Sequence, residues 1–246
     1  MRRETQNVLL VLVGGALLKI ALNGSYLRYV RPSIQPWLIA SGVVMVVLAA
    51  VAIVRDIRSY HATEQPAADH DGHRHGSRSS WLLVVPVLAI FLIAPPALGA
   101  DAVARAGGRT IISQAAPAVT QQGAAAFPPL PAEPVVPLSM SEFVTRSVWD
   151  ATGSLNSRVV RLTGFVAHEG GSTYLARLVI TCCAADATPV KVTLVGAGAD
   201  AQRDDQWLAV DGRIRPGSAT QHNDYTPTFD VVTVAPIATP ADPYEY

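Results

Sequence analysis

Three long apolar runs in the first hundred residues constrain the fold more than any other feature of this sequence. They cover about residues 8–27, 37–54 and 81–98, and each is close to the ~20 residues that an α-helix needs to cross a bilayer. Trp37 stands at the start of the second run, where an aromatic side chain suits the membrane interface. A single cleaved signal peptide does not explain three such runs. We therefore predict a membrane region over residues 1–98 with three transmembrane helices.

The arginines beside these runs indicate an orientation. With a cytoplasmic N-terminus, four arginines lie outside and six lie inside, namely Arg2, Arg3, Arg55, Arg58, Arg74 and Arg78. This excess favours a cytoplasmic N-terminus under the positive-inside rule. Three crossings then place the C-terminal part of the chain on the other side. We predict a multi-pass protein of the cell membrane, embedded in the lipid bilayer, whose C-terminal domain is extracytoplasmic.

Four of the six histidines lie between the second and third runs, in a loop over residues 59–80. His70, His73 and His75 stand among aspartates, and imidazole with carboxylate suits zinc, nickel or copper. The rest of the loop is rich in Ala, Ser, Gly and Pro, and a flexible tract of this kind binds a metal weakly. We predict that these three histidines capture metal ions. The alternative is a polar loop that happens to contain histidine.

The segment over residues 99–137 is rich in Ala and Pro and lacks apolar periodicity, which is typical of a semi-extended tether. The domain that follows, residues 138–246, opens with a short helix. Ser139 is a candidate N-cap of this helix, and Glu142 is its candidate capping-box partner.

Five short β-like runs follow the helix and are separated by turn residues. They cover residues 158–166, 173–181, 190–195, 206–214 and 229–237. Gly164 and Gly212 fall inside runs, where bulges and sharp bends occur. Five short strands in ~100 residues suit a small closed barrel, and the OB-fold has this strand count. We predict an all-β, OB-like small barrel with one short N-terminal helix; a small β-sandwich is the alternative.

The only two cysteines of the chain, Cys182 and Cys183, are adjacent and follow a β-branched apolar run. Asp186 lies three residues further on. Because adjacent side chains of a strand point to opposite faces, both thiols can share one ligand only if the strand has ended or bulged at Cys182. Thiolate with imidazole selects zinc or Cu(I). We predict that Cys182, Cys183 and Asp186 form a metal site, with zinc as the candidate ion. The candidates for its remaining ligands are His168, His222 and Asp224.

Two other interpretations of the cysteine pair stay open. One thiol packs as a small hydrophobe and the other packs in the turn, with Asp186 capping the turn through its side chain. Alternatively, the two thiols form a vicinal disulfide with a redox role. The sequence alone does not choose among these three.

The charge balance bears on the class of partner. The chain has a formal net charge of zero, and residues 138–246 carry eight basic and twelve acidic residues, a balance of −4. A surface that binds phosphates usually has the opposite sign. We therefore expect no nucleic-acid partner.

Several motifs carry a resemblance to a known family. In chain order they are Gly164-Phe165, Cys182-Cys183-Ala184-Ala185-Asp186-Ala187, Asp205 to Gly212 with Trp207 inside it, and the terminal segment from Pro240 to Tyr246. With the apolar spans, the histidine loop and the tether, this layout resembles the YcgQ-like membrane proteins. These are described as one subunit of a two-component permease whose other member is a YcgR-like multi-span permease. The resemblance implies a transport role, an association with zinc, no enzyme activity and no catalytic residue.

Three functions follow as hypotheses. In the first, the chain is a membrane-anchored accessory subunit of a two-component permease that handles a divalent metal such as zinc. In the second, it is a membrane-tethered thiol oxidoreductase that uses Cys182 and Cys183, although adjacent cysteines lack the Cys-x-x-Cys spacing that tunes redox thiols. In the third, it is a tethered OB-like module that binds a protein or a glycan.

Overall fold

The computed structural model describes residues 3–62, 88, 96–106, 127–199 and 201–246. The chain divides into two compact units, Met1–Pro96 and Ala97–Tyr246.

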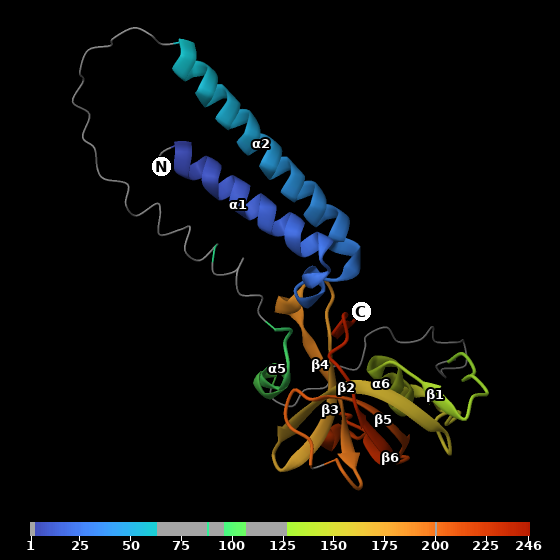
Figure 1. Ribbon diagram of the computed structural model, residues 1–246. Helices are drawn as coiled ribbons and strands as arrows, with labels where there is room; N and C mark the ends of the chain where they lie inside the picture. The colour runs from blue at the N-terminus through green and yellow to red at the C-terminus, as the bar shows by residue number, and fades with distance from the viewer. Residues whose placement is uncertain (1–2, 63–87, 89–95, 107–126, 200) are drawn as a thin grey trace. The chain divides into compact units, whose positions relative to one another are not determined.

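The described part of the first unit is a hairpin of two helices, α1 (Arg3–Leu22) and α2 (Gln35–Ala62), joined by two short 3-10 helices, Ser25–Arg28 and Pro32–Ile34 (Figure 1). The two helices pack closely where glycines face each other. A Cβ atom on Gly14 would stand 3.0 Å from the carbonyl oxygen of Gly42, and one on Gly42 would stand 3.1 Å from that of Gly14. Small residues that let helix backbones approach are typical of helix pairs in membranes.

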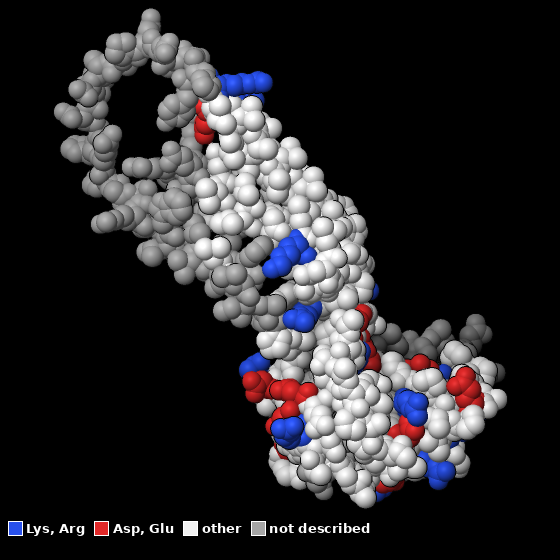
Figure 2. Space-filling model, viewed as in Figure 1, with Lys and Arg blue, Asp and Glu red and all other residues white. Residues whose placement is uncertain are grey.

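Pro32–Arg58, which includes most of α2, is long and apolar enough to cross a membrane, and it is the only such helix among the described residues. The apolar stretch of α1, Gln6–Leu22, is shorter than the helices that meet this criterion. Figure 2 shows that the surface of the two helices is nearly free of charge, apart from groups towards their ends. Several valines of α2 are exposed, among them Val44, Val47 and Val51.

The prediction of three transmembrane helices is therefore wrong for the part of the chain that the structure describes. The α-helical part of the first predicted span ends at Leu22, the last residue of α1. Gly24 and the 3-10 helix Ser25–Arg28 follow it. Most of the third, residues 81–98, lies outside the described residues. Its last two residues, Ala97 and Leu98, pack against the C-terminal unit, and the Leu98 N–H donates to the Tyr244 hydroxyl at 3.1 Å.

The second unit contains one mixed sheet of seven strands (Figure 1). The strands are β1 (Val135–Pro137), β2 (Val159–Glu169), β3 (Ser172–Val179), β4 (Thr188–Val195), β5 (Trp207–Ile214), β6 (Thr228–Pro236) and β7 (Tyr244–Glu245). Their order is β1-β2-β5-β6-β4-β3-β7, and β2 also pairs with β3. The pairs β1–β2, β3–β7 and β4–β6 are parallel, whereas the others are antiparallel.

This sheet corrects the prediction of an all-β, OB-like small barrel with five strands. The five predicted runs correspond to β2 to β6, but β1 and β7 add parallel partners at the two ends of the strand order. These two strands have three and two residues, too few to show any alternation in a sequence. The expected bulge at Gly212 is present, because the β5–β6 register shifts between Asp211 and Gly212.

Two buried clusters lie in this unit. The larger is built from inward-facing residues of the strands and from α6 (Met140–Trp149), whose Phe143 ring meets the Phe229 ring edge-on at 5.2 Å. The smaller is centred on Phe165, Leu178 and Trp207 and is covered in part by α5 (Ala100–Arg105). The Ser139 hydroxyl accepts a hydrogen bond from the Glu142 N–H at 3.1 Å, which confirms Ser139 as the N-cap of α6.

Candidate metal site

The two cysteines lie in a turn that connects β3 to β4, here named the cysteine turn and defined as residues 180–187. Strand β3 ends at Val179, before the cysteines, and a 3-10 helix η3 (Ala184–Asp186) follows them. The turn begins against the end of the chain, because the Ile180 N–H donates to the Glu245 carbonyl of β7 at 3.0 Å. The condition for two thiols to share a ligand is thus met: the strand has ended before Cys182.

The Asp186 carboxylate holds the cysteine turn together from inside. One of its oxygens accepts a hydrogen bond from the Thr181 N–H at 2.8 Å, and the other accepts from the Cys182 N–H at 2.8 Å and the Cys183 N–H at 3.4 Å. Capping of the turn by Asp186, proposed from the sequence, is confirmed. The same bonds draw the backbone of both cysteines around one carboxylate.

As a result, the two thiols and the carboxylate converge. The Sγ atoms of Cys182 and Cys183 lie 3.5 Å apart, and the potential ligand atoms of Cys182, Cys183 and Asp186 all lie within 4.8 Å of one another. Both cysteines are free thiols. For a tetrahedral zinc ion with Zn–S bonds of about 2.3 Å, two thiolate ligands lie about 3.8 Å apart, which is close to the observed separation.

The electrostatics of the turn favour the protonated thiol while no cation is present. The hydrogen bond to Asp186, followed by the one to Cys183, raises the pKa of Cys182 to about 12. Partial burial raises the pKa of Asp186, but hydrogen bonds from the Cys182 thiol and from three backbone N–H groups outweigh it, and the net pKa lies below the ordinary value. A metal ion bound by Cys182, Cys183 and Asp186 would supply the positive charge that lets both thiols ionise, and its binding would release protons.

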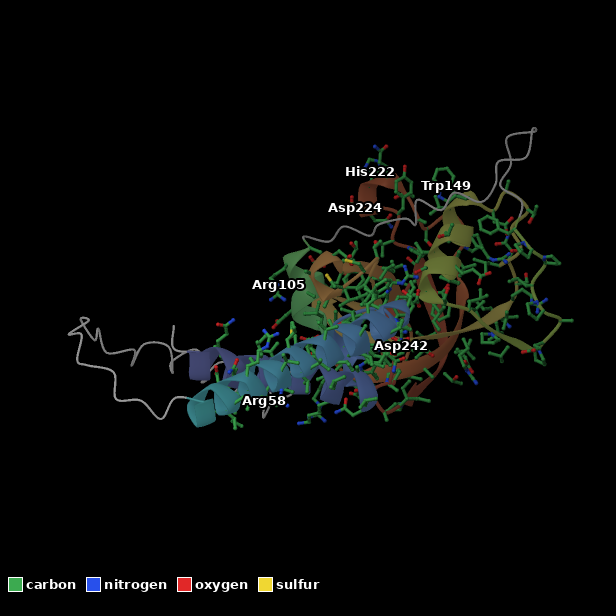
Figure 3. The ribbon with its side chains drawn as sticks, turned by 90° about the horizontal axis from the view of Figure 1, so that it is seen from above. Arg58, Arg105, Trp149, His222, Asp224 and Asp242 are labelled. Atoms are coloured by element: carbon green, nitrogen blue, oxygen red, sulfur yellow. The ribbon has the colours of Figure 1, made fainter. Side chains whose placement is uncertain are left out.

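The other predicted donors lie elsewhere. His168 on β2 places its Nδ1 atom 2.7 Å from Asp204. His222, in the 3-10 helix η4 (Gln221–Asn223), and Asp224 lie on an exposed loop at the outer edge of the C-terminal unit (Figure 3). Among the described residues, the one group of metal-ligand side chains is Cys182, Cys183 and Asp186. His70, His73 and His75 lie outside the described residues.

Residues near the C-terminus position the cysteine turn, and reasoning from the sequence did not find them. The Glu245 carboxylate accepts hydrogen bonds from the Met140 and Ser141 N–H groups, at 2.8 and 2.9 Å, and so caps α6. Arg177 of β3 donates to the Tyr244 carbonyl at 2.9 Å, and its guanidinium lies 5.0 Å from the centre of the Trp207 ring. Burial lowers the pKa of Arg177. The terminal Pro-Tyr-Glu-Tyr segment had stood out only as a family motif.

A second polar feature, also missed, lies on β2, β3 and β4. The side chain of Lys191 is 3% exposed; its Nζ lies 2.7 Å from a Glu169 carboxylate oxygen and 4.1 Å from the centre of the Tyr174 ring. These groups line a cavity of about 300 Å³ together with the η4 loop. Pairing with Glu169 compensates the buried ammonium, which otherwise costs several kcal/mol.

Comparison with known families gives two matches. The N-terminal domain of DUF1980 matches residues 6–109, and the C-terminal domain of DUF1980 matches residues 141–246. The first match contains most of α1 and all of α2, and the second contains the whole cysteine turn. No curated protein and no solved structure matches the chain significantly.

Proposed function

The chain belongs to the DUF1980 family and carries both of its domains, and we propose that it is a membrane-anchored accessory subunit of a permease that handles a thiophilic metal ion. One observation carries the proposal: two thiols and a carboxylate meet within 4.8 Å on a turn that has left the sheet. Thiolate is a soft ligand, and a set of two sulfur atoms and one oxygen suits zinc better than magnesium or calcium. The ion is the cargo of the protein.

The anchor in this proposal is the helical hairpin. Helix α2 has the length and the apolar surface to cross a bilayer, and its exposed valines face lipid. Helix α1 enters with it, since the glycine contact between Gly14 and Gly42 gives close packing that persists in lipid. Arg55 and Arg58 then stand at the interface, and Figure 3 shows Arg58 at the end of α2.

The side of the membrane on which the C-terminal unit lies is a separate question from the anchor. The placement is tested by labelling Cys182, which is exposed, with a membrane-impermeant maleimide in intact cells. An extracytoplasmic unit predicts labelling before lysis at the level seen after lysis. Labelling only after lysis would place the unit inside.

The partner in this proposal is a multi-span permease of the YcgR-like kind, which the resemblance implies. A hairpin of two helices is too small to enclose a pathway for an ion by itself, because its residues have lipid on most sides. The test is co-purification of the tagged full chain with the permease from gently solubilised membranes. A chain that purifies without it under several detergents would exclude a stable complex.

The alternative of a thiol oxidoreductase receives less support. Nucleophilic and redox-active cysteines have a lowered pKa, since the thiolate is the reactive form. Asp186 has the opposite effect on Cys182, raising its pKa to about 12.

Metal binding is tested on the full chain in detergent, with zinc titrated against a chromophoric chelator. Because the histidine loop is a second candidate, the titration is done in a variant in which His70, His73 and His75 are replaced by alanine. One zinc ion per chain is expected, and Cys182→Ser should remove it. His222→Ala, an exposed histidine outside the group, is the matched control and should leave binding unchanged. Equal zinc uptake in Cys182→Ser and in its parent would refute the site.

A further inference from the structure

We infer that the cysteine turn holds its metal ion with one coordination position open, and that the ion leaves by ligand exchange with an imidazole or thiolate of a partner protein. The inference rests on the proposed function and names the way in which the cargo is passed on.

The number of donors at the cysteine turn indicates an open coordination position. Zinc in structural sites is bound by four protein ligands, whereas sites that react keep one position for an outside ligand. Among the described residues, the group at the turn has three members, Cys182, Cys183 and Asp186, and no further His, Cys, Asp or Glu joins it. His168 of β2 pairs instead with Asp204, whose carboxylate lies 2.7 Å from its Nδ1 atom. The group therefore supplies three of four positions.

The exposure of the cysteine turn gives an outside ligand access to the donors. Cys182 is exposed, and Cys183 is half-buried. The two residues between the cysteines and Asp186 are alanines, and Ala185 is exposed, so no bulky side chain of the turn covers the donors. An outside imidazole or thiolate can therefore approach the ion directly. A closed structural site would instead bury its ligands.

The hydrogen bonds of Asp186 allow the cysteine turn to keep its shape when the ion leaves. Its carboxylate accepts from the N–H groups of Thr181, Cys182 and Cys183, so hydrogen bonds within the chain itself shape the turn. The protein can thus give up the ion and keep its fold, unlike a small domain that metal binding holds together. This suits a site that is filled and emptied repeatedly.

In the proposed exchange, the ligands of the partner replace those of the cysteine turn. The incoming ligand forms a bond to the ion at the open position, and the bond to the Asp186 oxygen breaks. Two further donors of the same partner then replace the two sulfur atoms one after the other, and each released thiolate takes one proton from solvent. The ion keeps its oxidation state throughout, so no oxidant or reductant is required. A partner that offers more than one soft ligand drives the transfer forward.

The order of the transfer reaction tests the inference. The full chain with the three loop histidines replaced by alanine is loaded with zinc, and 4-(2-pyridylazo)resorcinol is added in increasing excess. Exchange at an open position predicts a rate proportional to the concentration of this chelator. A rate that does not change with chelator concentration would mean that the ion leaves unaided and would overturn the inference. A chain that takes up no zinc would instead refute the proposed function, and the inference with it.

A second measurement observes the open position directly. The same variant is loaded with Co²⁺, whose visible absorption reports its ligands, and free imidazole is added as the probe. We expect a saturable change in the visible spectrum, and 2-methylimidazole, which is hindered beside its nitrogen, should bind at least tenfold more weakly. A spectrum that imidazole leaves unchanged at saturating concentration would mean that all positions are already filled and would contradict the inference.

Discussion

The carboxylate of Asp186 accepts a hydrogen bond from the Cys182 N–H at 2.8 Å, so the residue that shapes the cysteine turn is also the one that stands beside its thiols. A single side chain therefore fixes the backbone, raises the pKa of the neighbouring thiol and, in the proposed site, offers an oxygen to the metal ion. Different experiments measure these three effects separately.

The first prediction concerns the reactivity of Cys182 in the absence of metal. Asp186 raises the pKa of this thiol to about 12, so the thiolate is scarce below pH 9. Replacing Asp186 by asparagine removes the negative charge and should lower this pKa towards the ordinary value. In a Cys183→Ser background, Asp186→Asn should speed up maleimide labelling at pH 8 by at least tenfold. Equal rates in the two proteins would show that the carboxylate does not control the thiol.

A second prediction concerns acid. The pKa of Asp186 is lowered in the folded protein, so its contribution to stability is present above the ordinary value of 3.8 and disappears as the pH falls through the folded pKa. An asparagine side chain accepts with one oxygen instead of two, so Asp186→Asn should lower the free energy of unfolding by about 1 kcal/mol at pH 7. The difference should decrease as the pH falls below 3.8. Thermal unfolding of both proteins between pH 3 and 7 measures it, and a difference that stays constant would contradict the assignment.

The third prediction concerns the last strand. Glu245 caps α6 through Met140 and Ser141 and lies 3.7 Å from the Nε atom of Arg177. Glu245→Ala removes the cap and leaves the buried guanidinium without its carboxylate, which should destabilise the C-terminal unit by about 3 kcal/mol. Glu133→Ala, at an exposed glutamate, is the control and should change stability by less than about 0.5 kcal/mol. Chemical denaturation followed by tryptophan fluorescence distinguishes the two.

A fourth prediction tests the hairpin. A side chain on Gly14 would collide with the backbone of Gly42, whereas a Cβ atom on Gly15 meets nothing within 4 Å. Gly14→Leu should therefore separate α1 from α2 and lower the midpoint of thermal unfolding in detergent by at least 5 °C. Gly15→Leu adds the same side chain one position away and should leave the midpoint unchanged. Equal effects of the two substitutions would mean that the helices do not pack through Gly14.

The sequence was sufficient for elements whose pattern is local. The N-cap of α6 at Ser139, the bulge at Gly212 and the turn at Asp186 follow from residue types with a specific backbone preference. The strand bounds of the central sheet were close for the same reason, since alternation over five or more residues is visible in a sequence.

The rest depends on contacts between distant residues. The two-residue strand β7 has no periodicity, and only its pairing with β3 makes it a strand. Length and apolarity predicted a third transmembrane span that ends at Leu98, yet Ala97 and Leu98 pack within the C-terminal unit, where Tyr244 and the second cluster contact them. For the site, adjacency of the cysteines was visible in the sequence. The separation of His168 and His222 from them required the fold.

The measurement that most directly tests the central claim is the visible absorption of Co²⁺ bound to the full chain with the three loop histidines replaced by alanine. Coordination by the thiolates of Cys182 and Cys183 predicts an intense sulfur-to-cobalt charge-transfer band in the near ultraviolet at one ion per chain. The band should be lost in Cys182→Ser, as zinc binding is, and it should also be absent in the double serine variant. A cobalt spectrum without this band, or one unchanged in the double variant, would contradict the account.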